Sequence, residues 1–264
     1  MHEQSEFGLL LNEHVFDPIA RALGFHVAEG HHAVPDQIVM ALVVALGIIG
    51  FAIWLRGRLS VEQPGRMQHI VEVLLEALQG LMKEVIGKDP RPYMPLIFSL
   101  AFYIFVGNVI GQVPGFISPT SNLNITVSCA ICVFVYYNYQ GIRKHGFVRY
   151  LKHFAGPVWW LAWLLFPVEI VSHLARPFSL SMRLFGNIFA EELIIGSLNK
   201  YIFPFLISLP VMLLGLFAST IQAFIFVLLT GVYISGAVEE AHDESHSDEH
   251  KEAIVHSQQQ PAAA

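Results

Sequence analysis

Charged side chains are scarce in this chain of 264 residues. Asp, Glu, Lys and Arg make up 14% of it, against about a quarter in soluble globular domains, while 54% of the residues are hydrophobic. This composition excludes an ordinary water-soluble domain and indicates an integral membrane protein. The net charge of −6 gives no broad basic surface, so no nucleic-acid partner is expected.

Cysteine and phosphate-binding loops are sparse or missing. The two cysteines, Cys129 and Cys132, exclude a disulfide scaffold. Their CxxC lies in an apolar run without a second ligand pair at zinc spacing, which favours packing over metal binding. No G-x-x-x-x-G-K-[ST] sequence occurs, so the chain shows no ATP site of its own. We expect no cofactor and no catalytic residue.

Long uncharged runs predict where the chain crosses a membrane. After an external segment, 1–34, residues 37–55 form a charge-free run of about 19 residues, enough for a helix to cross a hydrocarbon core of roughly 30 Å. No Asp, Glu, Lys or Arg occurs between Pro92 and Ile142. This predicts a membrane hairpin over 96–141 with a polar turn inside it.

The remaining hydrophobic chain, residues 158–238, is long for two crossings. Its first stretch, 158–199, would be about 60 Å long as one straight helix, twice the thickness of a bilayer core. Either Pro167 and Pro177 divide it, or it runs strongly tilted and is held by protein contacts. The predicted fold class is an all-α polytopic membrane protein with five transmembrane crossings, one interfacial amphipathic helix, and two long, strongly tilted helices at its end.

The interfacial helix is predicted over residues 67–86, where polar and apolar side chains alternate at helical spacing. The polar face holds Gln68, Glu72, Glu76, Gln79 and Lys83, and the apolar stripe holds Ile70, Leu74, Leu78, Leu81 and Val85. Both neighbours in sequence are membrane segments, which favours a helix lying in the interface over one packed on a soluble domain.

Basic residues indicate how the chain is oriented. They gather in two connections, 56–91 and 143–152, while the opposite side carries only Arg21 and Lys200. The positive-inside rule places both basic connections in the cytoplasm. The N-terminus is then outside and the C-terminus inside.

The acidic tail, residues 239–264, is expected to be disordered and cytoplasmic, because such a composition cannot bury a core. His242, His246 and His250 have the spacing of a helical metal site. The solvated tail is the favoured interpretation, and we assign no metal.

Five ionisable side chains lie inside 158–199, where each is costly: Glu169, Arg176, Arg183, Glu191 and Glu192. An Arg at the centre of a membrane costs at least about 2.5 kcal/mol and keeps its proton. The positions four residues before and after Arg183 hold Ser179 and Asn187, so no local ion pair is available. We interpret Arg183 as a fixed cation facing a partner, in preference to a salt bridge within the bundle.

Helix geometry separates these residues. At about 100° per residue, Glu192 lies about 180° from Arg183 and Glu191 about 80° from it. Arg176, Ser179, Asn187 and Ile194 all lie within about 40° of Arg183 and form one stripe with it. We rank Glu192 above Glu191 as a functional group, because Glu191 is placed to reach the headgroup zone.

The run Ser181–Asn187, SMRLFGN, followed by Ala190, Glu192 and Leu193, resembles the characteristic sequence of ATP synthase subunit a. In that family this subunit is the stator channel of the membrane sector. The similarity continues in Gln222–Phe226 and in the segments 107–114 and 119–126. It covers roughly residues 35–240.

The resemblance implies a rotary mechanism. Two offset half-channels would carry protons to and from the buried carboxylates of a rotating c-subunit ring and so couple proton flow to ATP synthesis. Arg183 would face the ring carboxylate, favour its ionised form and keep the half-channels apart. The other partners implied are the b-subunit peripheral stalk, the rest of the complex and the lipid bilayer. The basic loops and the lack of a recognisable targeting peptide favour a bacterial inner membrane, although an organelle-encoded homologue would have a similar sequence.

The same resemblance implies roles for other residues. Glu192 matches the polar relay position of the outer half-channel. The usual titratable partner of that relay falls on Gly215, so water would form the bridge. Gln222 matches the glutamine near the arginine, where its amide could bond the guanidinium, and Asn187 and Asn108 would line the proton path.

Glu169, His173 and Ser179 follow one another from the cytoplasmic end inward and are candidates for the inner half-channel, although His173 is equally well explained as an interfacial histidine. A standalone ion channel or a secondary transporter is the alternative function. A transporter would show a second copy of the Arg183 segment, and none is found. A channel would conduct without a partner ring.

Overall fold

The computed structural model describes Gly8, Leu10, His14 and residues 35–60, 63–87, 89–113, 116–146, 162–198 and 204–239. Throughout these residues the regular structure is helical. The elements are α3 (Asp36–Arg56), α4 (Arg66–Ile86), α5 (Met94–Gly111), the 3₁₀ turn η2 (Pro119–Ser121), α6 (Leu123–His145), α8 (Ala162–Leu198) and α9 (Pro204–Glu239). Most of the predicted external segment and the acidic tail beyond Glu239 lie outside the described residues.

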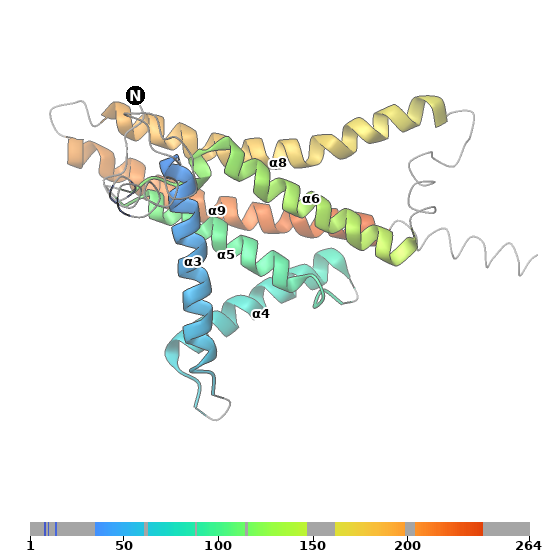
Figure 1. Ribbon diagram of the computed structural model, residues 1–264, viewed down its shortest axis with the longest axis horizontal. Coiled ribbons are helices and arrows are strands. Elements are labelled where there is room, and N and C mark those ends of the chain that lie inside the picture. The colour runs from blue at the N-terminus through green and yellow to red at the C-terminus, as the bar shows by residue number, and fades with distance from the viewer. Residues whose placement is uncertain are drawn as a thin grey trace, which may run out of the picture.

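The helices are arranged around a long antiparallel pair, α8 and α9 (Figure 1). Helix α6 packs along α8, and α5 packs along α9 in the opposite direction to it. Helix α4 packs mainly on α9 and makes a smaller contact with α5. Helix α3 stands across the direction of the others and packs mainly on α5 and η2.

In the part of the chain that the structure describes, four helices are long and apolar enough to cross a membrane: α3, α5, residues 123–144 of α6 and residues 209–238 of α9. Helix α8 is not among them because its ionisable and polar side chains lower its apolar character. The all-helical, multi-pass class is confirmed for the described residues. Five crossings, of which α8 would be the fifth, stay a prediction.

Helix α8 runs for 37 residues without a break, with Pro167 and Pro177 inside it. Its length is therefore about 55 Å. Of the two alternatives that the sequence left open, the continuous helix is the one observed. Proline is tolerated inside membrane helices because neighbouring helices can satisfy the backbone groups that it frees, and here α6, α9 and η2 all pack against α8.

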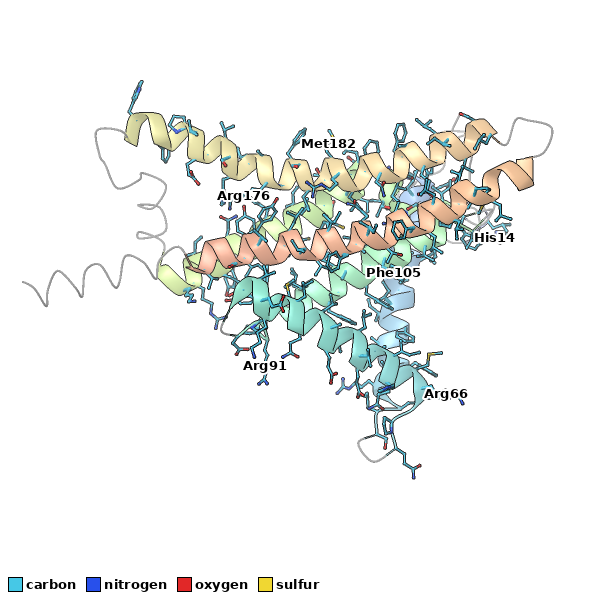
Figure 2. The ribbon with its side chains drawn as sticks, turned by 180° about the vertical axis from the view of Figure 1, so that it is seen from behind. His14, Arg66, Arg91, Phe105, Arg176 and Met182 are labelled. Carbon is cyan, nitrogen blue, oxygen red and sulfur yellow. The ribbon has the colours of Figure 1, made fainter. Side chains whose placement is uncertain are left out.

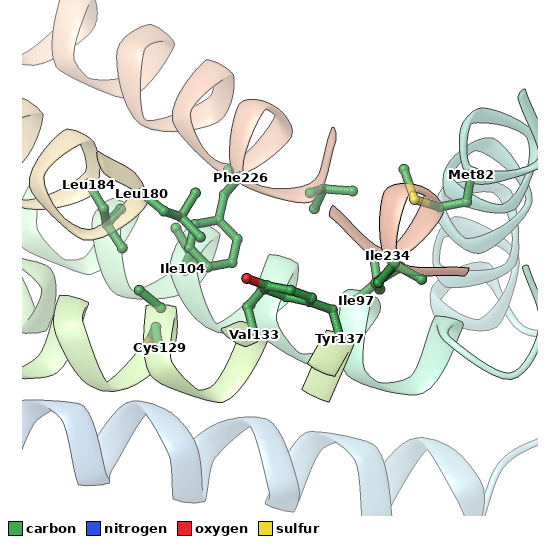
Figure 3. Packing of buried hydrophobic residues seen from close by; sticks show 14 of the residues in the cluster. Met82, Ile97, Ile104, Cys129, Val133, Tyr137, Leu180, Leu184, Phe226 and Ile234 are labelled. Atoms are coloured by element: carbon green, nitrogen blue, oxygen red, sulfur yellow. The ribbon is translucent and has the colours of Figure 1, made fainter. Parts of the chain in front are cut away.

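The core lies where α4, α5, α6, α8 and α9 meet (Figure 3). Its largest fully buried side chains include Tyr137 from α6, Phe226 from α9 and Met82 from α4. From α8, the buried Leu180 and Leu184 enter the same cluster. Because these residues are spaced four apart, they fix which side of α8 faces inward and therefore which side remains outward.

The two ends of helix α4 differ in how far their apolar side chains are buried. Met82, near its C-terminal end, is fully buried and lies against Gly231 of α9. Its N-terminal half leaves large apolar side chains exposed: Met67, Ile70, Val73 and Leu74. This amphipathic surface suits the interfacial position predicted from the sequence, which stays a prediction.

The turn η2 folds back tightly against the end of α5. A Cβ atom added to Gly111 would lie 2.5 Å from Cβ of Ser118 and 3.0 Å from its Cα. A Cβ on Gly107 would lie 3.1 Å from Cγ of Pro119. Glycine at these two positions therefore allows the connection between α5 and α6 to approach the helix.

We predict that Gly111→Ala destabilises the protein, by about 1–3 kcal/mol, because the new methyl group meets the backbone of Ser118 and not a movable side-chain end. The measurement is the thermal midpoint of the purified protein in detergent. The control is Gly47→Ala on α3, where an added Cβ meets nothing within 4 Å. Equal midpoints for the two variants would contradict this account of the turn.

Candidate functional site

Arg183 lies on the outward side of α8. Its neighbour Leu184 is fully buried, whereas Arg183 and Met182 are exposed. Within the described residues Arg183 forms no ion pair and no hydrogen bond through its side chain. Figure 2 shows Met182 pointing away from the bundle. A permanent cation on an otherwise apolar helix surface requires water or a counter-charge from outside the chain.

The other members of the predicted Arg183 stripe differ in exposure. Ser179 is exposed and Asn187 is half-buried. Arg176 instead lies on the side of α8 that faces α9 (Figure 2), with its guanidinium carbon 5.7 Å from the centre of the Tyr233 ring. That contact is a cation–π interaction, which gives Arg176 an internal partner. Among the arginines of α8, only Arg183 faces outward.

A second feature of the site is a group of buried polar side chains on α5 and α9. In the described part of the chain, four buried side-chain atoms have no hydrogen-bond partner: Nδ2 of Asn108, Oε1 of Gln112, Oγ of Ser219 and Nε2 of Gln222. An unsatisfied buried polar group costs about 1–3 kcal/mol. Polar groups of this kind are the ones that bound water satisfies in proteins.

These four residues, which we call the α5–α9 polar seam, follow the geometry of two packed helices. Asn108 lies on α5, and Gln112, four residues later, is the residue that caps the end of that helix. Ser219 and Gln222 are one turn apart on α9. Helices α5 and α9 pack together in opposite directions (Figure 1), and the two pairs come from these packed helices. Gln222 forms no hydrogen bond with Arg183, because its side chain is buried and Arg183 faces outward.

Asn108 is held in place by η2. The Thr120 hydroxyl donates to Oδ1 of Asn108 at 2.5 Å and lies 2.8 Å from the Ser118 hydroxyl. The Ser118 hydroxyl is 3.3 Å from the carbonyl oxygen of Gly107. The amide oxygen of Asn108 is therefore engaged, and its Nδ2 is the atom that remains for the seam.

Glu191 joins α8 to the end of this seam. Nε2 of Gln112 donates a hydrogen bond to Oε1 of Glu191. The Glu191 carboxylate fills the space above Gly215 of α9, where an added Cβ would overlap it. The position at which the sequence predicted a bridging water is thus occupied by a carboxylate, that of the residue ranked below Glu192. Glu192 itself is half-buried.

Gln112 was not singled out in the sequence, although a signal for it exists. It lies four residues after Asn108 in an uncharged span, so the two amides share one face of α5. The roles of Gln112 and Gly215 are recognised only from the structure, which places the Glu191 carboxylate of α8 against both residues.

The three inner candidates do not form one group. His173 is half-buried and lies between α8 and α6, with Nε2 2.9 Å from Oδ1 of Asn138 and 3.2 Å from the Tyr137 hydroxyl. Glu169, one turn away from His173, is half-buried, whereas Ser179 is exposed on another face of α8. His173 is therefore packed against α6, and its two interpretations, as part of the inner half-channel or as an interfacial histidine, both stay predictions.

No three His, Cys, Asp or Glu side chains come together as a metal site within the described ranges. Cys129 is buried and Cys132 is exposed, and both thiols are free. The three histidines of the acidic tail, His242, His246 and His250, lie outside the described residues.

Comparison with known proteins shows which family the chain belongs to. The family model described as "ATP synthase A chain" matches residues 38–235. "ATP synthase subunit a" of Geobacter sulfurreducens is 49% identical over 179 residues, which are 68% of this chain and 77% of that protein. The protein of the same name from Desulfosudis oleivorans is 43% identical over 229 residues, 86% of this chain and 97% of its own. "ATP synthase subunit a 1" of Syntrophotalea carbinolica is 44% identical over 212 residues, 80% and 89%. The chain therefore belongs to the ATP synthase A chain family.

Proposed function

We propose that this chain is the stator channel subunit of an ATP synthase, which carries protons through two half-channels to and from the carboxylates of a rotating c-subunit ring. As a member of its family the chain is a component of the ATP synthase membrane sector and has no catalytic site of its own. The observation that carries the proposal is Arg183, an outward-facing cation without a partner in the described residues of the chain.

Arg183 supplies the electrostatic part of the mechanism. Its guanidinium keeps its charge at every accessible pH. A ring carboxylate that arrives opposite it is stabilised in the ionised form and must have released its proton. The same charge repels a proton passing along the helix surface, so a proton crosses only by travelling on the ring.

The α5–α9 polar seam and Glu191 supply the outer half-channel in this proposal. Glu191 accepts a hydrogen bond from Gln112 at one end of the seam. Asn108, Ser219 and Gln222 offer polar atoms along its length. A titrating carboxylate followed by hydrogen-bonding groups is the arrangement that passes protons through water. Asn187 and Glu192, both half-buried on α8, are further members of this path.

The inner half-channel would use the cytoplasmic half of α8. Glu169 and His173 lie on the side of α8 that faces the bundle, while Ser179 lies on the outward side nearer to Arg183. A proton leaving the ring beside Arg183 would pass Ser179 and reach the titratable pair at the cytoplasmic end.

The remaining parts of the proposal concern the surroundings of the chain. Its partners would be the c-subunit ring at the Arg183 face of α8 and the b-subunit stalk. The chain is a multi-pass protein of a bacterial inner membrane. The basic connections favour an N-terminus outside, a C-terminus in the cytoplasm and α4 in the cytoplasmic interface.

We predict that Arg183→Ala abolishes ATP-driven proton uptake into vesicles carrying the whole complex, a loss of at least about 100-fold. The matched control is Arg143→Ala, an exposed cation near the end of α6, which should stay within about twofold of the parent. Co-purification of the ring with the Arg183 variant shows that assembly is intact. Coupled uptake in that variant would contradict the proposal and favour a standalone channel or a transporter.

The second prediction compares the two neighbouring carboxylates. Glu191→Gln should slow proton uptake by about 100-fold, because a titrating relay is removed while the hydrogen bond to Gln112 can be kept. Glu192→Gln should slow it less. The same assay over a range of pH measures both rates.

Gly215→Ala provides an independent test, since the added methyl group must displace the Glu191 carboxylate and should also slow uptake. Gly50→Ala on α3 is its control, because nothing lies within 4 Å of a Cβ there and α3 is not part of the proposed proton path. If Glu192→Gln were the slower of the two carboxylate variants and Gly215→Ala had no effect, the relay would be Glu192, and Glu191 would serve only in packing.

A further inference from the structure

The connection from α3 to α4 is fastened to the first turn of α4 by one buried side chain, Gln68. The backbone N–H of Ser60 donates to Oε1 of Gln68 at 3.1 Å, and Nε2 of Gln68 donates to the Ser60 carbonyl oxygen at 3.0 Å. The same Nε2 donates to Oε1 of Glu72 at 2.8 Å. The amide of Gln68 therefore uses both its donors and its acceptor to fix the corner between the two helices.

This corner brings arginines from both helices together, where α3 ends beside the start of α4 (Figure 1). Arg56 is the last residue of α3, and Arg58 lies two residues before Ser60. Arg66 is the first residue of α4 and lies two residues before Gln68. Two residues of chain span at most about 7 Å, so Arg58 and Arg66 both begin near the Ser60–Gln68 hydrogen bonds. Figure 2 shows Arg66 at this corner.

The three arginines are exposed, and they outnumber the acidic residues around them. Among the residues that the structure describes, none forms an ion pair with Arg56, Arg58 or Arg66. Glu62, in the same connection, lies outside the described residues. With one glutamate against three arginines, residues 56–66 carry a net charge of +2. The corner is therefore a local positive charge on a chain whose net charge is negative.

Trp54 holds one of these cations at the end of a helix that can span a membrane. Cζ of Arg58 lies 4.5 Å from the centre of the Trp54 ring, which is a cation–π contact. Helix α3 is long and apolar enough to cross a membrane, and tryptophan near the end of such a helix favours the level of the lipid headgroups. A guanidinium in this position still offers N–H donors, and two of them can bind one phosphate.

Exposed apolar side chains lie beside the arginines. Leu59, in the connection, is 58% exposed, and Met67 and Ile70 of α4 are 55% and 61% exposed. At about 100° per residue, Ile70 lies about 40° around α4 from Arg66 and about 60° from Met67. Glu72 lies at least about 140° from both Met67 and Ile70. One face of the corner therefore combines cations with apolar surface, and the Glu72 carboxylate points away from it.

We propose that the corner between α3 and α4 is a binding site for an anionic phospholipid. The arginines bind the phosphate of the headgroup, and the acyl chains cover the exposed apolar side chains. The residues of the site are Arg56, Arg58, Arg66, Leu59, Met67 and Ile70. The apolar side chains favour a phospholipid over free phosphate, which would leave them in water, and the cations favour an anionic headgroup over a zwitterionic one. This inference goes beyond the proposed stator function and does not depend on it.

The test measures which lipid lies against Trp54. The full chain is placed in phosphatidylcholine vesicles that contain a rising fraction of phosphatidylglycerol with acyl chains brominated close to the headgroup. Bromine quenches the fluorescence of a tryptophan that it touches, and subtracting the signal of a Trp54→Phe counterpart removes the other three tryptophans. The same titration with brominated phosphatidylcholine is the reference. The ratio of the two association constants is the preference for the anionic lipid at this site.

We expect the parent to prefer phosphatidylglycerol by at least about fivefold, because each cation near a membrane surface attracts anionic lipid. Arg58→Gln combined with Arg66→Gln should lower this preference to below about twofold. The matched control is Arg143→Gln combined with Lys144→Gln, which removes the same charge at the end of α6 and should stay within about twofold of the parent. Gln68→Ala keeps every charge but releases Ser60, so it should also lower the preference.

Equal association constants for the two lipids in the parent would overturn the proposal, whether or not the variants fold. An equal loss in the Arg143 and Lys144 control, or a full preference in Gln68→Ala, would also overturn it, because net charge alone would then attract the lipid. The parent titration is repeated with the whole ATP synthase complex in the same vesicles. A preference that persists there supports the lipid site, whereas one that disappears shows that another subunit covers the corner and overturns the proposal.

Discussion

A guanidinium that keeps its proton at every accessible pH must be accommodated by a bundle that otherwise keeps charge away from its apolar surfaces. The chain meets this constraint by burying one side of α8 and leaving Arg183 exposed beside it. Leu180 and Leu184 enter the core between α5, α6 and α9, and this fixes the rotation of α8 about its axis. Arg183 lies about 60° around the helix from Leu180 and about 100° from Leu184, so this packing leaves it at the exposed edge of the buried side.

The same rotation brings Glu191 inward. At about 100° per residue, two adjacent carboxylates on a helix face different neighbours, and here Glu191 is the one that meets Gln112. A carboxylate in that position needs space, which the missing side chain of Gly215 provides. An acid on α8, an amide on α5 and a glycine on α9 thus form one unit whose members are separated by long stretches of sequence.

The sequence was sufficient for some of these features and insufficient for others, for physical reasons. The helical class and the apolar runs followed from composition, because hydrocarbon selects strongly against charge. The outward cation followed from the absence of a carboxylate one turn from Arg183. The choice between Glu191 and Glu192 did not follow, because it depends on how α8 is rotated against α5 and α9. The partners of His173 on α6 could not be predicted from the sequence either, since they lie 35 and 36 residues away in the chain.

The continuity of α8 has a mechanical consequence. The helix passes through Pro167 and Pro177 without interruption. One continuous helix therefore carries His173, Arg183 and Glu191 at fixed spacings. Over the 18 residues from His173 to Glu191 the axial separation is about 27 Å. A sliding of α8 by a single turn would separate Glu191 from Gln112 and His173 from Asn138 in the same movement. The axial position of α8 therefore determines whether the contacts at both ends of the bundle form, and it determines them together.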